Sequence, residues 1–208
     1  ISMYQKYQTV SSAEFMKYKK LELKKFQIAS SYNTALVYNQ MMDYSSEEIL
    51  LAVLQSGARY IEFNIFNSKF GPDAIPVVSN GYKTGEYQLT FNSITFESCC
   101  KVISDHAFKQ RINDQGVPNY KDPLFIGLNL NTNNNIYCLD VMANIIMDYF
   151  KDRLLDHEYS FQQSNIADIK LKDLKQKIVF FSSAGFEGSN MEELVNASWD
   201  GKMMQRIH

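Results

Sequence analysis

Along the chain, apolar runs of strand length alternate with segments whose apolar residues repeat at helical spacing. Runs rich in Val, Ile, Leu and Phe occur at 58–67, 123–131 and 177–183, and each ends in polar residues. Shorter extended segments are expected at 26–31 and 75–81. Helices are expected at 12–24, 45–56, about 94–110 and about 137–154. This alternation predicts a parallel α/β sheet, either open or closed into a barrel.

The predicted helices carry their own start and core signals. Ser45 followed by Glu48 fits a capping box, and Gly57 ends that helix. Its apolar face is predicted to hold Ile49, Leu50, Val53 and Leu54. The side chains expected to face the core from the two later helices are Phe96, Cys100, Ile103, Phe108, Leu139, Met142, Ile146, Tyr149 and Phe150.

Polar residues gather where the predicted strands end. Ligands bind at the carboxyl ends of parallel strands, so this rim is the place to search for a site. Asn129 and Asn131 are two residues apart and therefore share one face of their strand. The predicted rim set is Ser31, Tyr32, Asn33, Glu62, Asn64, Asn80, Asn129, Asn131, Ser182 and Ser183.

This rim set is poor in catalytic groups. Glu62 is its single acid, and it contains no His. Amides cannot exchange protons as a general acid or base, and the ordinary pKa of a tyrosine such as Tyr32, about 10, is poorly placed for that task. Calcium prefers several anionic oxygens, so one carboxylate among amides predicts no metal. The residues alone indicate a polar, hydrogen-bonding pocket with little catalytic power.

The remaining candidates for chemistry are weak. His106, His157 and His208 are expected to be structural or solvent-facing. Ser182 and Ser183 have no neighbouring base, and no strand is followed by a glycine-rich phosphate loop. Asn196-Ala-Ser198 fits a glycosylation acceptor, but it is a single match.

Composition narrows the class of partner and compartment. A net charge of −2 argues against a nucleic-acid-binding chain, and no apolar run approaches the about 20 residues needed to span a bilayer. Three cysteines without metal-type spacing favour a reducing, intracellular setting, either soluble or peripheral to a membrane. One basic run is expected to be a solvated helix face or a contact with acidic lipid or protein; its members are Lys17, Lys19, Lys20, Lys24 and Lys25.

Several short segments, in order along the chain, resemble the X region of the phosphoinositide-specific phospholipase C family. IASSYNT resembles the family's Ile-Ser-Ser-Ser-His-Asn-Thr, and GARYIEFNIFN resembles Gly-Cys-Arg-X-Val-Glu-Leu-Asp-Cys-Trp-Asp. IPVVSNGY is similar to Pro-Val-Val-Tyr-His-Gly-His, and FIGLNLN stands where the family has Leu-Ser-Leu-Glu-Asn-His. ISDHAF and LKDLKQKIVFFSS resemble the helix and the fourth strand that follow. The resemblance implies an α/β fold, a phospholipase C-like phosphodiesterase TIM barrel.

Active members of that family bind calcium and cleave a phosphoinositide through attack of the inositol 2-hydroxyl on phosphorus. The family's two catalytic histidines fall on Tyr32 and Asn80. One metal-binding Asn is retained as Asn33, and the first acid is retained as Glu62.

The family's other two metal-binding acids are replaced by Asn64 and Asn129. The phosphate-binding Lys after the fourth strand is also absent from FFSSAG. The resemblance therefore predicts a vestigial pocket of Asn33, Glu62, Asn64 and Asn129, with Asn33 and Glu62 as weak metal candidates and no cofactor. We expect a pseudoenzyme that is a structural or interaction component of a larger assembly; a virion component is one form of it. The alternatives are a phosphoinositide or inositol phosphate binding module and a divergent phosphoric diester hydrolase.

The resemblance also divides the chain. We expect a basic helical lead at 1–25, an X-like half barrel at 26–188 and the start of a Y-like half at 189–208, where MEELVNASW resembles the opening of the family's Y region. The chain would supply about the N-terminal half of the barrel plus the start of the second half. Half a barrel exposes sheet edges and an apolar face, so either a longer chain or a protein partner is expected to complete it.

Overall fold

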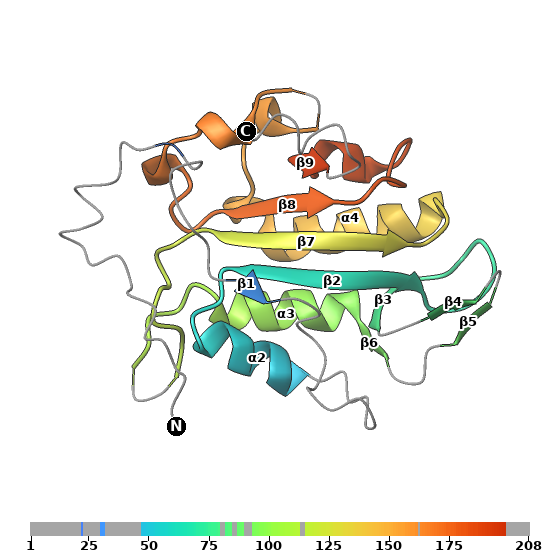
Figure 1. Ribbon diagram of the computed structural model, residues 1–208, viewed down its shortest axis with the longest axis horizontal. Helices are drawn as coiled ribbons and strands as arrows, with labels where there is room; N and C mark the ends of the chain where they lie inside the picture. Colours follow the sequence, from blue (N-terminus) through green and yellow to red (C-terminus); the bar gives the residue numbers. More distant parts are fainter. Residues whose placement is uncertain are drawn as a thin grey trace.

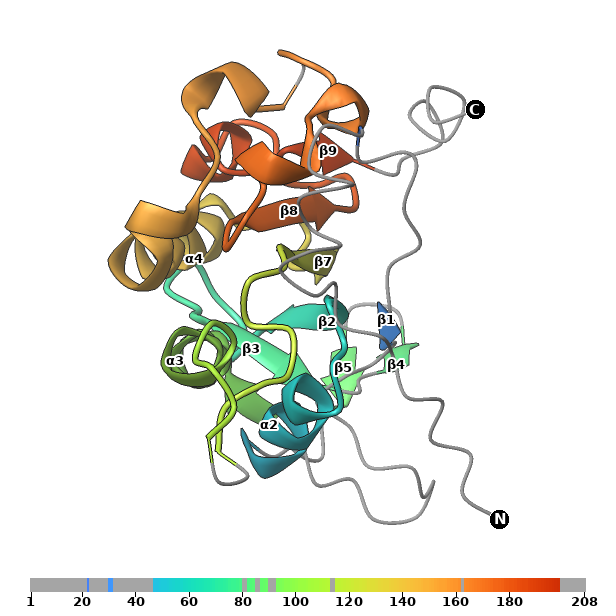
Figure 2. The ribbon, with the colours of Figure 1, turned by 90° about the vertical axis from the view of Figure 1, so that its left-hand side faces the viewer.

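The computed structural model describes residues 22, 30–31, 47–79, 82–84, 87–89, 93–112, 115–161 and 163–198. Within these ranges a twisted sheet is covered on one side by three α-helices (Figure 1). The helices are α2 (Glu47–Gln55), α3 (Phe96–His106) and α4 (Ile136–Phe150). Viewed from the end of the sheet, all three lie on the same side of the strands (Figure 2).

Five strands of the sheet run parallel and follow one another in chain order. They are β1 (Ser30–Ser31), β2 (Tyr60–Asn67), β7 (Leu124–Asn131), β8 (Ile178–Ser182) and β9 (Ala197–Ser198). Each pairs with the next, and the helices α3 and α4 make the crossovers into β7 and toward β8. The sequence prediction of successive parallel strands with intervening helices is confirmed for these elements.

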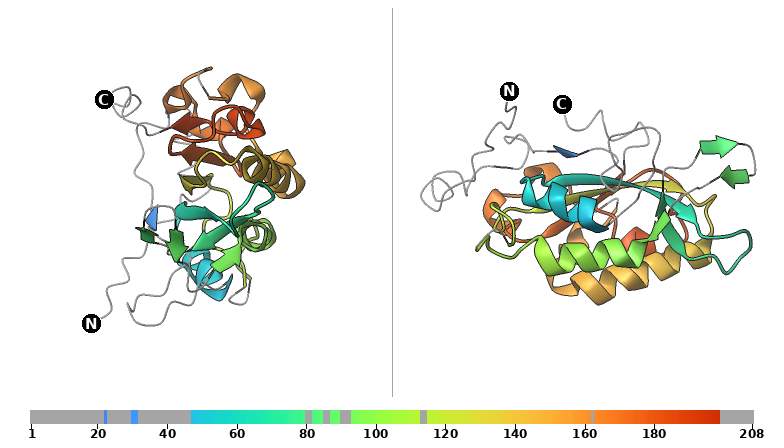
Figure 3. Two further views of the ribbon diagram at one scale, coloured as in Figure 1. Left: turned by 90° about the vertical axis from the view of Figure 1, so that its right-hand side faces the viewer. Right: turned by 90° about the horizontal axis from the view of Figure 1, so that it is seen from below.

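The segment after β2 adds antiparallel strands to the parallel ones. Strand β3 (Pro76–Ser79) pairs antiparallel with β2, and β6 (Ser93–Thr95) pairs antiparallel with β3. Between them, β4 (Tyr82–Thr84) and β5 (Tyr87–Leu89) form a separate hairpin that projects beyond the main sheet (Figure 3). The loop 68–75 is too short for a parallel crossover, which takes a dozen or more residues, so the chain turns back. The extended segment predicted at 75–81 is confirmed for Pro76–Ser79, and the structure adds its antiparallel direction.

The helices begin and end where local chemistry satisfies their terminal groups. Thr95 caps α3 by accepting a hydrogen bond from the Ser98 N–H (3.1 Å), and Asn135 caps α4 by accepting from the Cys138 N–H (3.1 Å). Gly57, which follows α2, adopts a φ of +98°, a conformation that side-chain-bearing residues rarely accept. The predicted helix ends at 110 and 154 were too late, because α3 stops at His106 and α4 gives way to a 3₁₀ turn.

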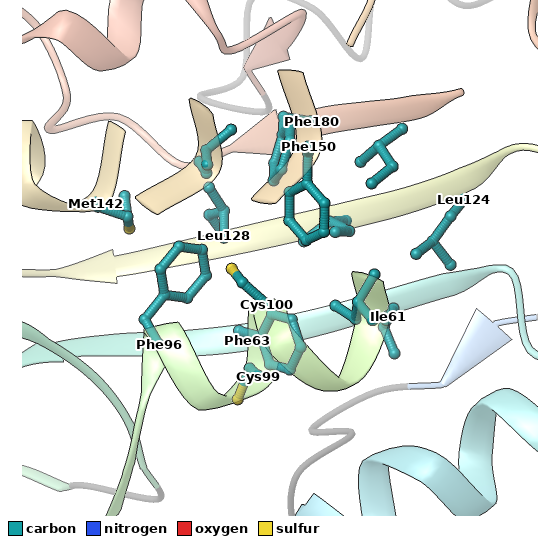
Figure 4. Close-up of a cluster of buried hydrophobic side chains, with 14 of the residues drawn as sticks. Ile61, Phe63, Phe96, Cys99, Cys100, Leu124, Leu128, Met142, Phe150 and Phe180 are labelled. Atoms are coloured by element: carbon teal, nitrogen blue, oxygen red, sulfur yellow. The ribbon is translucent and has the colours of Figure 1, made fainter. Parts of the chain in front are cut away.

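The main core lies between the helices and one face of the sheet (Figure 4). Alternate residues of β2 point into it, as do alternate residues of β7 and β8. Its largest fully buried members include Phe63, Phe96, Phe150 and Phe180. The predicted core contacts of α3 and α4 are confirmed, with Tyr149 only partly buried. All three cysteines are free and buried.

A second, smaller core covers the lower part of the opposite face. There, Phe125 and Val179 pack against apolar residues of the segment that connects α4 to β8. That segment contains the 3₁₀ turns η2 (Lys151–Arg153), η3 (His157–Tyr159), η4 (Ile166–Asp168) and η5 (Leu171–Asp173). Nearer the carboxyl ends of the strands, the same face carries polar side chains. None of the described residues of the second core covers that part.

Asn196 is a structural residue at the edge of the sheet. It follows η6 (Asn190–Glu193), is 8% exposed, and its Oδ1 accepts from the Phe180 N–H (2.9 Å). Its Nδ2 donates to the Tyr159 carbonyl (2.9 Å), and its own N–H donates to the Phe180 carbonyl. Because this side chain is buried and its Nδ2 is bonded to the Tyr159 carbonyl, the possible glycosylation acceptor is not accessible in the fold.

We expect Asn196→Ala to lower the free energy of unfolding by about 2 kcal/mol, because it leaves the Phe180 N–H and the Tyr159 carbonyl unpaired in a buried place. Urea unfolding followed by circular dichroism measures the change. Asn144→Ala, at an exposed position of α4, is the control and should leave stability nearly unchanged. Equal stability of the two variants would contradict the structural role.

Some predictions fall on residues that are not described. The basic run from Lys17 to Lys25, the predicted helix at 12–24 apart from residue 22, and the positions Tyr32, Asn33 and Asn80 lie outside the described residues. Within the described part of the chain, no helix combines the length and the apolar character that crossing a bilayer requires.

Candidate functional site

The candidate site lies on the face of β2 and β7 that points away from the helices. Ile61, Phe63 and Ile65 of β2 enter the helix-covered core, so the residues between them point to the opposite face. The same alternation applies to β7, where Ile126 and Leu128 enter the core. The residues that share the opposite face are Tyr60, Glu62, Asn64, Gly127, Asn129 and Asn131.

Two amides occupy the centre of this face. The register places Asn64 directly opposite Asn129, and the Asn129 Nδ2 donates to the Asn64 Oδ1 at 2.8 Å. Both side chains are half-buried. An amide pair can form such a bond without any counter-ion, whereas two carboxylates in these places would repel each other. The two strands are thus joined by a neutral cross-strand bond within this face.

Below the amide pair, Tyr60 and Glu62 lie against a glycine. The Tyr60 hydroxyl donates to a Glu62 carboxylate oxygen at 3.4 Å. Gly127 stands opposite Glu62, and a Cβ on it would lie 2.5 Å from the Tyr60 hydroxyl oxygen. A glycine in the middle of a strand is a sign of such a close approach. The missing side chain therefore gives Tyr60 and Glu62 the room they occupy.

The pKa values of both members of this pair are raised. Burial raises the pKa of Glu62, partly opposed by the hydrogen bond from Tyr60. Burial, and then the negative charge and the hydrogen bond of Glu62, raise the pKa of Tyr60 to about 12. Tyr60 therefore keeps its proton at neutral pH and serves as a hydrogen-bond donor.

Of the other predicted rim residues, some serve the backbone. The Asn131 Nδ2 donates to the Asn129 carbonyl (3.2 Å), and the Ser183 Oγ accepts from the Leu130 N–H (2.8 Å). Ser182 is fully buried, and its hydroxyl donates to the Leu128 carbonyl (3.4 Å). Ser182 points to the helix-covered face, since Phe180, two residues earlier, does so. Ser182 thus lies at the carboxyl end of β8, as predicted, but its side chain is buried on the face opposite the candidate site.

The structure brings Glu62, Asn64 and Asn129 together on adjacent strands. The partners expected from the β1 and β3 ends, Tyr32, Asn33 and Asn80, lie outside the described residues. Ser31 belongs to β1, which pairs with the start of β2. Tyr60 and Gly127 were missed by the sequence analysis, although the spacing of Tyr60 two residues before Glu62 and the glycine inside a strand both pointed to them.

Metal ligands and bases are scarce around this face. Among the described residues, no group of three or more His, Cys, Asp or Glu side chains is placed to hold a metal ion. His106 lies in the last turn of α3, and His157 lies in η3, within the segment that leads into β8. Neither histidine belongs to β2 or β7, whose residues form the candidate face. The His157 Nδ1 is 3.3 Å from the Ser160 hydroxyl, which agrees with a structural role.

The sequence of this chain is similar to those of known proteins of one family. The model of the phosphatidylinositol-specific phospholipase C X domain matches residues 19–183. The mouse 1-phosphatidylinositol 4,5-bisphosphate phosphodiesterase eta-1 is 37% identical over 83 residues, which are 40% of this chain and 4% of that protein. The human gamma-2 enzyme of the same name is 34% identical over 86 residues, 41% of this chain and 6% of that protein.

Solved structures agree on the fold. The PLC21 protein of S. officinalis superposes with a TM-score of 0.65 at 22% identity, over 86% of this chain and 24% of that chain. A calcium-dependent phosphoinositol-specific phospholipase C from a Pseudomonas species gives a TM-score of 0.54 at 11% identity, over 88% of this chain and 68% of that chain. The chain thus spans only a small part of the curated relatives it matches. The successive parallel strands are part of the phospholipase C TIM barrel, and the chain belongs to the phosphatidylinositol-specific phospholipase C X-domain family.

Proposed function

We propose that this X-domain chain is a pseudoenzyme that acts as a non-catalytic structural or interaction component of a larger protein assembly. The observation that carries the proposal is the hydrogen bond between Asn129 and Asn64. These are the two positions at which the family resemblance leads to metal-binding acids. In this chain they form a neutral pair whose polar atoms are directed at each other.

The described residues do not fit the calcium ion that the family implies. Calcium takes six to eight oxygen ligands and binds tightly when several of them are carboxylates. Of the matched positions, Glu62 alone carries a carboxyl group, and its pKa is raised, so burial disfavours the charged form that a cation needs.

The proton-transfer machinery is equally poor. The family's histidine positions hold Tyr32 and Asn80. An amide has no proton to exchange near neutral pH, and an unassisted phenol is a weak base. Among the described residues of this face, Glu62 is the one group that could accept a proton from an attacking hydroxyl, and no histidine stands beside it on β2 or β7. What the face retains is hydrogen bonding, which supports folding and packing.

The proposal is tested on the protein by titration calorimetry with calcium and by hydrolysis of phosphatidylinositol 4,5-bisphosphate vesicles. We expect no calcium binding in the micromolar range and no calcium-stimulated release of inositol phosphate. Binding of inositol trisphosphate without hydrolysis would favour the head-group binding alternative. Calcium-independent hydrolysis would favour the divergent hydrolase, and either result would overturn the scaffold role.

Replacing Asn64 and Asn129 by acids should restore calcium binding, which provides a positive control. We expect Asn64→Asp with Asn129→Glu to bind calcium at least about tenfold more tightly than the unaltered chain, because two carboxylates join Glu62. In EDTA the same variant should unfold at a lower temperature, because like charges then face each other across the strands, and calcium should reverse the loss. Asn144→Asp adds a carboxylate on exposed α4 and should show neither effect.

Failure of the double variant to gain calcium affinity would contradict the assignment of Asn64 and Asn129 to the metal positions. Calcium binding by the unaltered chain that equals that of the double variant would contradict the pseudoenzyme itself. The two failures are therefore separable in one set of titrations.

A further inference from the structure

The Lys and Arg side chains that are at least partly buried all lie in one place. Arg59 is 4% exposed, and Lys121, Arg153 and Lys177 are half-buried. We call these four residues the cation cluster. Burying positive charge is costly, so four such side chains in one region need an explanation. Every other Lys or Arg whose burial the structure describes is exposed, namely Lys69, Lys101, Lys109, Arg111, Lys151, Lys170, Lys172 and Lys175.

Hydrogen bonds around Gln176 bring the half-buried members of the cation cluster together. The Gln176 N–H donates to the Lys121 carbonyl (3.1 Å), and the Arg153 Nη1 donates to the Gln176 carbonyl (3.2 Å). The Lys177 Nζ in turn donates to the carbonyls of the two residues that flank Arg153, at 3.4 Å and 3.2 Å. Lys121, Arg153 and Lys177 therefore belong to three chain segments that are in direct contact.

The two guanidinium groups of the cluster lie against one aromatic ring. The Arg153 Cζ is 4.3 Å from the centre of the Phe108 ring, and the Arg59 Cζ is 5.6 Å from it. The face of an aromatic ring attracts a cation, which helps to fix both groups. The Arg59 Nη2 also donates to the carbonyl of Asn119, two residues before Lys121. Arg59 thus joins the cluster from its buried side.

The cation cluster lies at the end of the sheet where the strands begin. Arg59 directly precedes β2, Lys177 directly precedes β8, and Lys121 is three residues before β7. Figure 2 shows the molecule from this end. Asn64 lies five residues beyond Arg59 along β2, which corresponds to about 16 Å. The cluster is therefore separate from the face that carries Asn64 and Asn129.

The surroundings of the cluster do not neutralise its charge. No ion pair between described residues includes one of its members, whose printed hydrogen bonds go to uncharged backbone carbonyls. The carboxylate of Asp122 acts on Arg59, and the end of α4, which precedes Arg153, adds about half a negative charge. Exposed charges close by in the sequence cancel; they are Lys151, Lys172 and Lys175 against Asp152, Asp156 and Asp173.

The balance leaves an excess of positive charge at a fixed place. Four cations stand against one carboxylate and about half a charge from the helix end, so more than two positive charges remain. A carboxylate ligand would leave more than one of them unbalanced. A phosphate monoester carries about 1.5 to 2 negative charges at pH 7, which is close to the excess.

We propose that the cation cluster binds a phosphate monoester, either as a soluble molecule or as a lipid head group. Lys121, Arg153 and Lys177 contact the phosphate oxygens, because a guanidinium offers paired donors and an ammonium a compact charge. Arg59 adds positive charge from the buried side. These side chains are already held by their hydrogen bonds and ring contacts, so little conformational entropy is lost on binding. The inference goes beyond the proposed scaffold role and does not depend on it.

The test compares glycerol 3-phosphate in solution with phosphatidic acid in vesicles, because the two carry the same phosphate ester. Titration calorimetry measures the first, and co-sedimentation with the vesicles measures the second. We expect saturable binding of at least one probe, which weakens as the salt concentration rises. Binding of glycerol 3-phosphate alone assigns the cluster to a soluble ester, and binding of the vesicles alone assigns it to a lipid. Lactate is the carboxylate control and should bind at least about tenfold more weakly than glycerol 3-phosphate.

Lys121→Gln should weaken binding of the phosphate probe at least about tenfold, because it removes one of the contacting charges. Lys101→Gln, at an exposed position of α3, is the charge-matched control and should leave the affinity unchanged. In phosphate-free buffer, Lys121→Gln should melt at the same temperature as the unaltered protein or at a higher one, since it relieves repulsion among like charges. A merely structural lysine would give the opposite pattern, a lower melting temperature with unchanged affinity.

The proposal is overturned if neither probe binds with saturation at about 10 mM, or if lactate binds as well as the ester. Equal loss of affinity in Lys101→Gln, or unchanged affinity in both Lys121→Gln and Arg153→Gln, would overturn it too. Binding of inositol trisphosphate that Lys121→Gln weakens supports this cluster, whereas binding that both variants leave unchanged belongs to the candidate face and counts against it. These readouts need neither calcium nor hydrolysis, so the proposal can fail while the pseudoenzyme proposal stands.

Discussion

Arg59→Met is expected to lower the free energy of unfolding by about 3 kcal/mol. Arg59 is 4% exposed, and its Nη2 donates to the Ala107 carbonyl (2.8 Å) and to the Asn119 carbonyl (2.5 Å). Burial lowers the pKa of Arg59 to about 10, opposed by the charge of Asp122, so the guanidinium stays charged at neutral pH. Methionine keeps the stem but leaves two carbonyls without a donor and Asp122 without its cation. A hydrogen bond to a charged group contributes about 1.5–3 kcal/mol, so the loss of two costs about 3–6 kcal/mol.

We expect the lower end of that range because some of the N–H groups of Arg59 have no hydrogen-bond partner. Its Nε and Nη1 are buried and have no hydrogen-bond partner, so part of the cost of burying the charge is already present in the unaltered protein. The guanidinium also stands 5.6 Å from the centre of the Phe108 ring, a contact that methionine keeps only in its apolar part. Chemical unfolding measures the loss, and Lys109→Met at an exposed neighbouring site is the charge-matched control.

The loss should depend on pH in a defined direction. Burial raises the pKa of Asp122, and Arg59 opposes that rise, so removing Arg59 raises the pKa further. The ordinary pKa of this carboxyl group is 3.8, and its pKa in the folded protein is higher. As the pH rises from 3.8 through the folded pKa, such a group lowers the stability of the fold. The deficit of Arg59→Met relative to the unaltered protein should therefore be larger at pH 7 than at pH 4. A variant as stable as the parent at pH 7 would mean that burying the unpartnered N–H groups outweighs the bonds.

The periodicity of apolar residues was sufficient to predict the helices and the parallel strands, since both depend on local spacing. Ile61, Phe63 and Ile65 alternate as a half-buried strand must, and Leu139, Met142 and Ile146 repeat as a helix must. The antiparallel β3 needed a different signal, the length of the loop 68–75. The burial of Asn196 and Ser182 depends on contacts with residues far away in sequence, which periodicity does not contain.

The candidate site was predictable in part for the same reason. A period of two places Glu62 and Asn64 on one face of β2, and the family resemblance adds Asn129. The register of β2 against β7 decides that Asn64 meets Asn129 and that Glu62 meets Gly127. Register is set by the packing of both strands against the helices, so the amide pair itself emerges only from the structure.

The second large prediction concerns the two faces of the sheet. Phe180→Ala is expected to lower the free energy of unfolding by about 3–5 kcal/mol, because the ring is fully buried between the strands and α4. Its ring centre is 6.3 Å from that of Phe150, so the substitution also removes an aromatic contact. The cavity cannot be filled by one neighbouring side chain without moving a helix. Thermal or urea unfolding measures the loss.

Phe181→Ala is the matched control, because it is the same substitution one residue later on the opposite face. Phe181 is half-buried and contacts Tyr60 and Phe125, with ring centres 6.4 Å and 6.2 Å away. Its loss should be smaller, about 1–2 kcal/mol, because less apolar area is removed from water. Equal losses would mean that the face carrying Tyr60 and Glu62 is as deeply covered as the helix side, which would contradict the partial exposure of these side chains. A larger loss for Phe180 would mean that the helix side of the sheet contributes most of the packing energy. Side chains on the opposite face can then change from acids to amides without disturbing the main core.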